Sequence, residues 1–271
     1  SEGREALAPA ELVIIAVPSH QLRPNTRSIR EEIAPDAIIL SATKGLELPA
    51  GERMSQVLEQ ELPPHVHSSV CVLSGPNLAH EVIQGKPSST VIAGRDVGKA
   101  ERAQSILMSG SFRVYTSDDV IGVELGGALK NIIALGAGIA DGMEAGDNAK
   151  SAFITRGLAE ITRLGIAAGA HPLTFAGLAG LGDLMATCNS RLSRNHYVGE
   201  QLAQGRSWPD IQKSMDNVVE GVNATTAALE MAGRLGVEMP ITQVTYRVLF
   251  DGLSPGKAAA ELMGRPGRSE R

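Results

Sequence analysis

The strongest constraint on the fold of this chain is a change of pattern near residue 116. Before it, short apolar runs rich in β-branched residues alternate with loops that contain Gly, Ser or Pro. These runs are Leu12–Val17, Ala37–Leu40, Val70–Leu73, Thr90–Ala93 and Phe112–Tyr115. Segments that can form helices, Gln21–Ile33 and Gly51–Glu61, separate the first three runs. Short apolar strands separated by helices predict a parallel sheet that is buried on both faces.

After Asp118 the strand signals stop, and apolar residues recur at helical spacing. The expected helices are Asp119–Asp141, Ser151–Gly165, Asn195–Gly205, Val222–Gly236 and Ile241–Asp251. Gly165 and Gly236 are expected to end their helices, and Pro172 and Pro240 to begin the next ones. The fold class is therefore α/β. A Rossmann-type parallel sheet domain over residues 1–116 is followed by an all-α substrate domain over residues 117–271.

Composition narrows the classes of partner. The 271 residues include 25 Lys and Arg against 30 Asp and Glu, a net charge of −5, which argues against a general nucleic-acid or anionic-membrane binder. Two cysteines, Cys71 and Cys188, form neither a disulfide framework nor a zinc pattern, so we expect a cytoplasmic protein without a metal. The most apolar stretch, 120–140, contains Glu124 and Lys130, which argues against a membrane span.

Lys130 is the first candidate for chemistry. It lies in an expected helix that is apolar or small on nearly every side, and such a helix is buried. Burial lowers the pKa of a lysine and fits it for proton transfer near neutrality. A lysine that extends along its stem to the surface explains the position equally well. Asn131 beside it could orient a carbonyl group or merely satisfy a helix contact.

A second candidate is the segment Ser190–His196 ahead of a helical run. Ser, Arg and Asn at a helix N-terminus can bind a phosphate or carboxylate, although an ordinary cap with exposed arginines is the more frequent explanation. The preceding segment, Gly177–Thr187, is rich in glycine and has one acid, Asp183. That acid could pair with a buried lysine or belong to a tight turn.

A third candidate is the set of loops that follow the first three strands: Pro18–His20, Thr43–Gly45 and Ser74–Ala79. Ligands of open α/β sheets bind outside the carboxyl ends of the strands, so three polar loops there fit a cofactor edge. Turns made by Gly and Pro are the alternative explanation.

Taken together, the ordered motifs resemble a known family. They are Val17–His20 (VPSH), Ser41–Gly45 (SATKG), Ser74–Glu81 (SGPNLAHE), Glu124–Asn131 (ELGGALKN), Gly177–Asp183 (GLAGLGD), Ser193–Asn195 (SRN) and Val218–Gly221 (VVEG). Each motif is weak alone, but their order along nearly all of residues 11–255 is similar to that of the NAD(P)-dependent glycerol-3-phosphate dehydrogenases of bacteria.

The resemblance implies an oxidoreductase that interconverts dihydroxyacetone phosphate and sn-glycerol 3-phosphate with NAD or NADP, supplying glycerol 3-phosphate for phospholipid synthesis. It implies that Lys130 is the proton donor and acceptor. The implied substrate contacts are Lys44, Gly75, Asn77, Lys130, Asp183, Ser193, Arg194 and Asn195. The implied cofactor contacts are Lys44, Ala79, Arg194, Val218 and Glu220. Asn77 departs from the Ser common in bacterial members. A cytoplasmic protein is implied, and a homodimer is compatible with the resemblance.

The largest departure from the family is the lack of a G-x-G-x-x-G fingerprint before the first strand. We therefore expect a truncated member that lacks roughly 60 residues, since a βαβ unit takes about 30. Such a chain would expose a strand edge near Leu12–Val17, bind NADH or NADPH weakly and show negligible reductase activity. Two alternatives stay open. One is another two-domain reductase, of the ketopantoate or hydroxyacid type, and the other is a non-catalytic fragment that binds a sugar phosphate or a partner.

Overall fold

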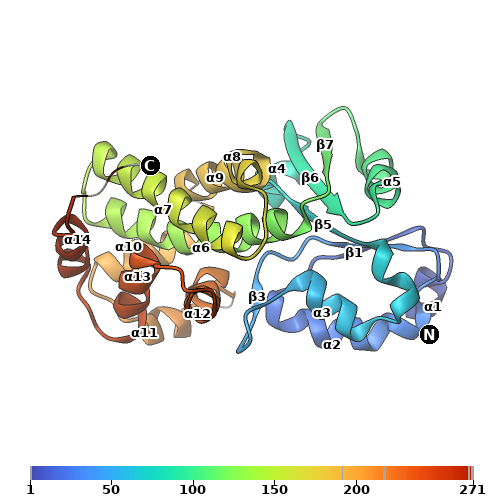
Figure 1. Cartoon of the computed structure of the whole chain (residues 1–271), viewed down its shortest axis with the longest axis horizontal. Helices are drawn as coiled ribbons and strands as arrows, with labels where there is room; N and C mark the ends of the chain where they lie inside the picture. The colour runs from blue at the N-terminus through green and yellow to red at the C-terminus, as the bar shows by residue number, and fades with distance from the viewer. Residues whose placement is uncertain (1, 191, 216–217, 268, 270–271) are drawn as a thin grey trace.

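The computed structural model describes residues 2–190, 192–215, 218–267 and 269. Figure 1 shows the strands and their helices on the right of the view and the later helices on the left, with α6 (Val120–Gly142) among the later helices. All described strands lie before residue 118, and the described elements after it are helical. The change of pattern near residue 116 therefore coincides with the change from strands to helices.

The main sheet contains the five predicted strands. They are β1 (Leu12–Ile15), β2 (Ile38–Ser41), β5 (Val70–Ser74), β6 (Ser88–Gly94) and β7 (Phe112–Ser117), in the spatial order β1-β2-β5-β6-β7. Strand β1 forms one edge, with Ile14 half exposed. Helices α2 (Ser19–Ile29) and α3 (Met54–Glu61) confirm the two helical segments expected here. They bury Leu22 and Leu58 in one core with the β1 residues Val13 and Ile15.

One expectation about the sheet was wrong. Strands β1, β2 and β5 are parallel, as are β6 and β7, but β5 and β6 are antiparallel, with Cys71 opposite Gly94. The reason is the connection between β5 and β6, whose only helix is α4 (Ala79–Ile83). Five helical residues span about 7 Å, less than the roughly 23 Å of a seven-residue strand, so no helix runs back along the sheet as in a parallel crossover. The chain therefore turns and returns antiparallel.

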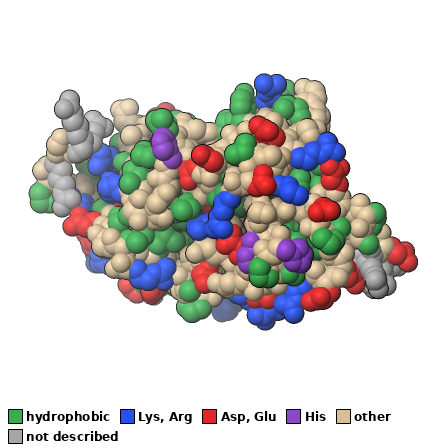
Figure 2. Space-filling view, turned by 45° about the vertical axis from the view of Figure 1, so that its right-hand side comes forward, with side chains coloured by type: hydrophobic (Ala, Val, Ile, Leu, Met, Phe, Trp, Pro, Cys, Tyr) green, Lys and Arg blue, Asp and Glu red, His purple; other side chains and the backbone are tan. Residues whose placement is uncertain are grey.

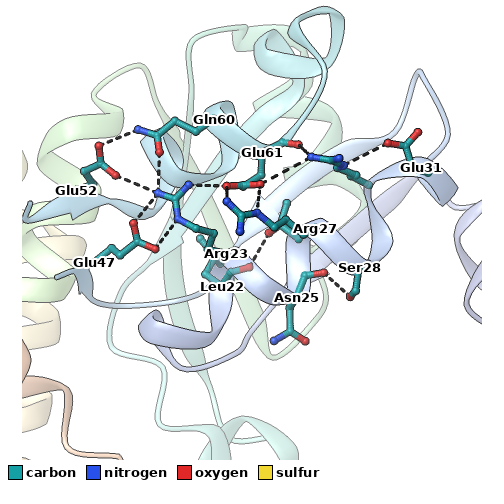
Figure 3. A network of polar contacts seen from close by, with 12 residues as sticks. Leu22, Arg23, Asn25, Arg27, Ser28, Glu31, Glu47, Glu52, Gln60 and Glu61 are labelled. Carbon is teal, nitrogen blue, oxygen red and sulfur yellow. Dashed lines mark hydrogen bonds and ion pairs between the residues drawn. The ribbon is translucent and has the colours of Figure 1, made fainter. Parts of the chain in front are cut away.

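A network of ion pairs shapes the loops between β2 and α3, which include the hairpin of β3 (Leu46–Glu47) and β4 (Glu52–Arg53). Arg23 of α2 donates to Glu47 of β3 (2.6 and 2.8 Å) and to Glu61 of α3 (2.5 Å), and Arg27 also binds Glu61 (2.6 Å; Figure 3). These guanidinium groups hold the pKa of the Glu61 carboxyl below its usual range. The network ties α2, the hairpin and α3 together next to the loop that carries Lys44.

Helix α6 (Val120–Gly142) is the centre of the helical part. Its length and hydropathy would allow it to span a membrane, but 89% of the relevant window is buried inside the protein, as expected for a core helix. The helices that follow are α7 (Asp147–Ala167), α8 (Pro172–Ala176), a single π-helical turn (Leu178–Gly182), α9 (Asp183–Asn189), α10 (Arg194–Ala203), α11 (Trp208–Lys213), α12 (Glu220–Leu235), α13 (Pro240–Phe250) and α14 (Pro255–Met263). Helix α10 approaches α6 closely: a Cβ on Gly138 would lie 2.0 Å from the His196 carbonyl oxygen.

The predicted helix ends were partly right. Gly236 ends α12 in the left-handed conformation (φ 66°), and Pro172 and Pro240 begin α8 and α13. Gly165, in contrast, lies inside α7, which continues to Ala167. Its lack of a side chain makes room for the Phe175 ring, which a Cβ would meet at 2.1 Å. Here glycine permits close packing and does not stop the helix.

Candidate active site

The site forms where the carboxyl ends of the parallel strands meet α6. Gly127 allows this approach, because a Cβ there would lie 2.4 Å from Ser74 Oγ at the end of β5, and Gly126 allows the π-helical turn to pack on α6, with a Cβ 2.6 Å from the Ala179 carbonyl oxygen. Glycine in a helix interior costs about 1 kcal/mol relative to alanine, and close packing against the strand ends offsets that cost. One turn further on, Lys130 therefore lies next to the loops that follow the strands.

Lys130 is a buried ammonium group, 6% exposed, and does not extend along its stem to the surface. Its Nζ donates to an Asp183 carboxylate oxygen and to Thr187 Oγ1 (2.7 Å). Burial, helped by the positive charge of Lys44, lowers the pKa of Lys130 to about 8, although Asp183 opposes the shift. A lysine with this pKa can both give and accept a proton near neutral pH.

Asp183 lies between two ammonium groups. Besides Lys130, its Oδ2 accepts a hydrogen bond from Lys44 Nζ (2.7 Å), which also donates to the Gly75 carbonyl oxygen (2.8 Å). Lys44 comes from the loop after β2, Gly75 from the loop after β5 and Asp183 from the start of α9. Asp183 is only 2% exposed, so the charges interact where water screens them little. One carboxylate thus joins the sheet to the helical part at Lys130.

A second polar cluster lies around the start of α10. Asn195 Nδ2 donates to Asn131 Oδ1 (2.9 Å), and Asn195 Oδ1 accepts from the Gly221 backbone N–H (3.0 Å). Arg194 is exposed and donates to the Val218 carbonyl oxygen (2.7 Å). Ser193 Oγ accepts from the His196 N–H (3.3 Å), so this buried serine caps α10. The cluster places a guanidinium group and a helix N-terminus together, which suits an anion.

The edge formed by the three strand loops also carries atoms without a partner. Within the described part of the chain, the buried Ser41 Oγ, Ser74 Oγ and Asn77 Oδ1 have no hydrogen-bond partner. Buried polar atoms are rarely left unpaired, so these oxygens fit a ligand or water that brings donors. Nearby, the Glu220 carboxylate accepts hydrogen bonds from the N–H and Oγ of Ser19 (2.9 and 2.7 Å). Ser41 and Ser74 line a cavity of about 10 Å³, which is room for one water, whereas the Glu220 carboxylate offers acceptor atoms to a ligand.

The face seen in Figure 2 carries Lys and Arg side chains interspersed with Asp and Glu side chains. Charges of both signs there are typical of a face that does not attract a polyanion as a whole.

Comparison with known proteins identifies the family. Residues 119–260 match the family model described as the NAD-dependent glycerol-3-phosphate dehydrogenase C-terminus, and residues 1–100 match the corresponding N-terminus. A relative named glycerol-3-phosphate dehydrogenase (NAD(P)+) from Dehalococcoides mccartyi is 53% identical over 96% of this chain and 72% of its own length. The chain belongs to the NAD-dependent glycerol-3-phosphate dehydrogenase family.

Other family members give the same result. The relative from Desulfitobacterium hafniense is 49% identical over 97% of this chain and 74% of its own length. The crystal structure of glycerol-3-phosphate dehydrogenase from Coxiella burnetii superposes with a TM-score of 0.89 at 35% identity, covering 97% of this chain and 79% of that one. A ketopantoate reductase from Ralstonia eutropha, at a TM-score of 0.56 and 17% identity, shares the fold alone. The chain is therefore an NAD(P)-dependent oxidoreductase of this family, with a Rossmann-type sheet followed by helices.

Most of the residues expected in the site contact one another, and they form two separate clusters. Lys44, Gly75, Lys130 and Asp183 form the first, and Arg194, Asn195 and Val218 the second. Glu220 follows Val218 by two positions, but its side chain contacts Ser19. Asn77 donates to the Ser89 carbonyl oxygen (3.1 Å) from the loop after β5, and Ala79 is exposed at the start of α4.

Sequence reasoning missed Thr187, although its place four residues after Asp183 on a short helix gives both side chains one face. It also missed the contact between Ser19 and Glu220, which no local signal reveals because 201 positions separate the two residues.

Proposed function

We propose that this protein reduces dihydroxyacetone phosphate to sn-glycerol 3-phosphate, and catalyses the reverse oxidation, with NADH or NADPH. The 53% identity to a named NAD(P)+ glycerol-3-phosphate dehydrogenase over 96% of the chain carries this proposal. The buried pair of Lys130 and Asp183 supports it with chemistry that a carbonyl reduction needs. When bound, the nicotinamide supplies the hydride, and the protein supplies position and electrostatics.

Lys130 is proposed as the general acid and base. In the direction of reduction, its ammonium group gives a proton to the ketone oxygen while the carbonyl carbon gains a hydride. In the direction of oxidation, the neutral amine accepts the hydroxyl proton. Thr187 and Asp183 hold Nζ in place, and the pKa of about 8 keeps both protonation states populated near neutral pH.

The substrate phosphate is proposed to bind at the start of α10. Arg194 offers the guanidinium group, and the proposal adds Ser193 and Asn195 as neighbouring contacts. Lys44, Gly75 and Asn77 are proposed to contact the substrate from the sheet side, close to Lys130 and Asp183.

The dinucleotide is proposed to contact Lys44, Ala79, Arg194, Val218 and Glu220. The unpaired Asn77 Oδ1 and the Glu220 carboxylate support a ligand with several hydrogen-bond donors at this edge.

The test is a spectrophotometric assay of NADH and NADPH oxidation by the full-length protein with dihydroxyacetone phosphate. Dihydroxyacetone, ketopantoate and a short 2-oxo acid are the comparison substrates. We expect oxidation that depends on the phosphorylated ketone and yields sn-glycerol 3-phosphate as the product. Faster turnover with a 2-oxo acid would replace this proposal with the hydroxyacid or ketopantoate alternative.

We also propose a domain boundary between residues 116 and 117, a homodimer and a cytoplasmic location. The boundary is supported by the end of β7 at Ser117 and the start of α6 at Val120. The location is supported by two buried, free cysteines, Cys71 and Cys188, which suit a reducing compartment. The homodimer is compatible with the family resemblance, and sedimentation equilibrium of the protein tests it.

A further inference from the structure

Helix α2 begins without a cap of its own. The residue before it, Pro18, makes no side-chain hydrogen bond to the helix, and the first turn contains no acidic residue. Glu220, at the start of α12 in the helical half of the molecule, caps α2 instead. Ser19 donates its backbone N–H to Glu220 Oε1 (2.9 Å) and its hydroxyl to Oε2 (2.7 Å). Both oxygens of one carboxylate are therefore held by one residue at a helix N-terminus, where negative charge is stabilised.

The space around this contact is closely filled. Ser19 is 1% exposed, and Gly45 packs against it from the loop after β2. A Cβ on Gly45 would lie 2.5 Å from Ser19 Cβ and 2.7 Å from Glu220 Oε2. Only glycine leaves the carboxylate in this position. Gly45 directly follows Lys44, so the same loop forms part of the Lys130 site.

The backbone around Glu220 is also held in place. The residues on either side of it are bonded to α10, because Val218 accepts from Arg194 and Gly221 donates to Asn195. The segment Val218–Gly221 is thus tied to both halves of the molecule, to α2 through Ser19 and to α10 through Arg194 and Asn195. A carboxylate held in this way has little freedom to reorient.

We propose that Ser19 is a positioning residue for dinucleotide binding, because it sets the orientation of the Glu220 carboxylate at the cofactor edge. This inference rests on the proposed function, which makes Glu220 a cofactor contact. Each carboxylate oxygen has about two lone-pair positions, so one hydrogen bond from Ser19 leaves a position on each oxygen for a donor of the ligand. Preorganisation of a binding group lowers the cost of ordering it when the ligand arrives.

The experiment measures the Kd of NADH and NADPH by nicotinamide fluorescence in the full-length protein, without substrate. Ser19→Ala keeps the backbone hydrogen bond to Glu220 and removes the hydroxyl. We expect Kd to rise about 5- to 20-fold. This is less than the roughly 12- to 160-fold typical of losing a hydrogen bond to a charged group, because the backbone N–H of Ser19 still holds one carboxylate oxygen. In the Glu220→Gln background the same substitution should change Kd less than about twofold, because the two residues act as one unit. For Ser19→Ala alone, the kcat at saturating cofactor should stay within about twofold of that of the unsubstituted protein.

Thr26→Val is the matched control for a general weakening of α2. Thr26 is fully buried in the same helix, and its hydroxyl donates to the Leu22 carbonyl oxygen (2.8 Å). We expect it to lower the melting temperature without changing Kd. If Ser19→Ala does not fold, Ser19→Cys, which retains a weak donor, takes its place and should give a smaller rise in Kd.

Several results would overturn the inference. They are an unchanged Kd in Ser19→Ala, an equal rise in Thr26→Val, or effects of Ser19→Ala and Glu220→Gln that simply add. Tighter cofactor binding in Ser19→Ala would also overturn the inference, because the cofactor would then have to break the hydrogen bond between Ser19 and Glu220 in order to bind. Dinucleotide binding without reduction of dihydroxyacetone phosphate would overturn the proposed function and leave the binding test of Ser19 valid. Absence of any dinucleotide binding would overturn both.

Discussion

The pKa of Lys130 gives the sharpest prediction, and Asp183→Asn is the substitution that tests it. Lys130 has a pKa of about 8 because burial and Lys44 favour the neutral amine, while Asp183 opposes them. At pH 7 about nine-tenths of the lysine is therefore protonated. An opposite charge within about 4–6 Å changes a pKa by about 1–3. Asparagine removes this charge and leaves two ammonium groups together, so the pKa of Lys130 should fall to about 5–7.

The lower pKa of Lys130 in Asp183→Asn should move the pH profiles of both reduction and oxidation to lower pH. At pH 7 the protonated fraction should fall from about nine-tenths to between about one half and one hundredth, which slows reduction by about 2- to 100-fold. Lower pH should restore protonation and with it part of the activity. Oxidation of sn-glycerol 3-phosphate needs the neutral amine, so it should rise through about pH 8 in the unsubstituted protein and reach its plateau at a lower pH in Asp183→Asn.

The assay is kcat/KM between pH 5 and 10 in both directions, since this ratio reports groups of the free enzyme. Glu160→Gln is the matched control, because Glu160 is a buried carboxylate that accepts from the Ile241 and Thr242 N–H groups at the start of α13. Glu160→Gln should lower the stability of the protein and leave the pH dependence of kcat/KM unchanged. A profile that stays near pH 8 in Asp183→Asn would refute the assignment of that titration to Lys130.

Four further substitutions test the site and the packing. Lys130→Met should cut turnover by about 10²–10⁴ with folding retained, since an apolar chain of similar length replaces a buried ammonium; circular dichroism and turnover check this, and near-normal turnover would remove Lys130 from the mechanism. Arg194→Lys should raise KM for dihydroxyacetone phosphate far more than for dihydroxyacetone, because lysine lacks the bidentate fork; equal losses for both ketones would contradict a phosphate contact. Gly138→Ala should destabilise the protein by about 1–3 kcal/mol because of its clash with the His196 carbonyl oxygen. Gly233→Ala, at an exposed helix position with open space around it, should stabilise the protein by up to about 1 kcal/mol. In chemical denaturation the midpoint of Gly138→Ala should be the lower of the two, and the reverse order would contradict the packing argument.

The family motifs were readable in the sequence because each is a short local string. Lys130 and the glycines before it stand together on one helix, and their apolar surroundings alone predicted burial. Whether the lysine is held inside or reaches the surface depended on Asp183 and Thr187, which come from another helix more than fifty positions later. The role of Asp183 as a bridge to Lys44 likewise needs the sheet and α9 to meet.

The sequence by itself determined where strands give way to helices, because the spacing of apolar residues is a local property that each element repeats. It also determined the starts of α8 and α13, since proline acts on its own backbone. Only the tertiary structure decided that β6 runs antiparallel to β5, that Gly165 packs against Phe175, and that Glu220 caps α2. Each of these depends on which distant surfaces come together, and that choice is made by the packing of the whole chain, in which no short segment carries enough free energy to decide it alone.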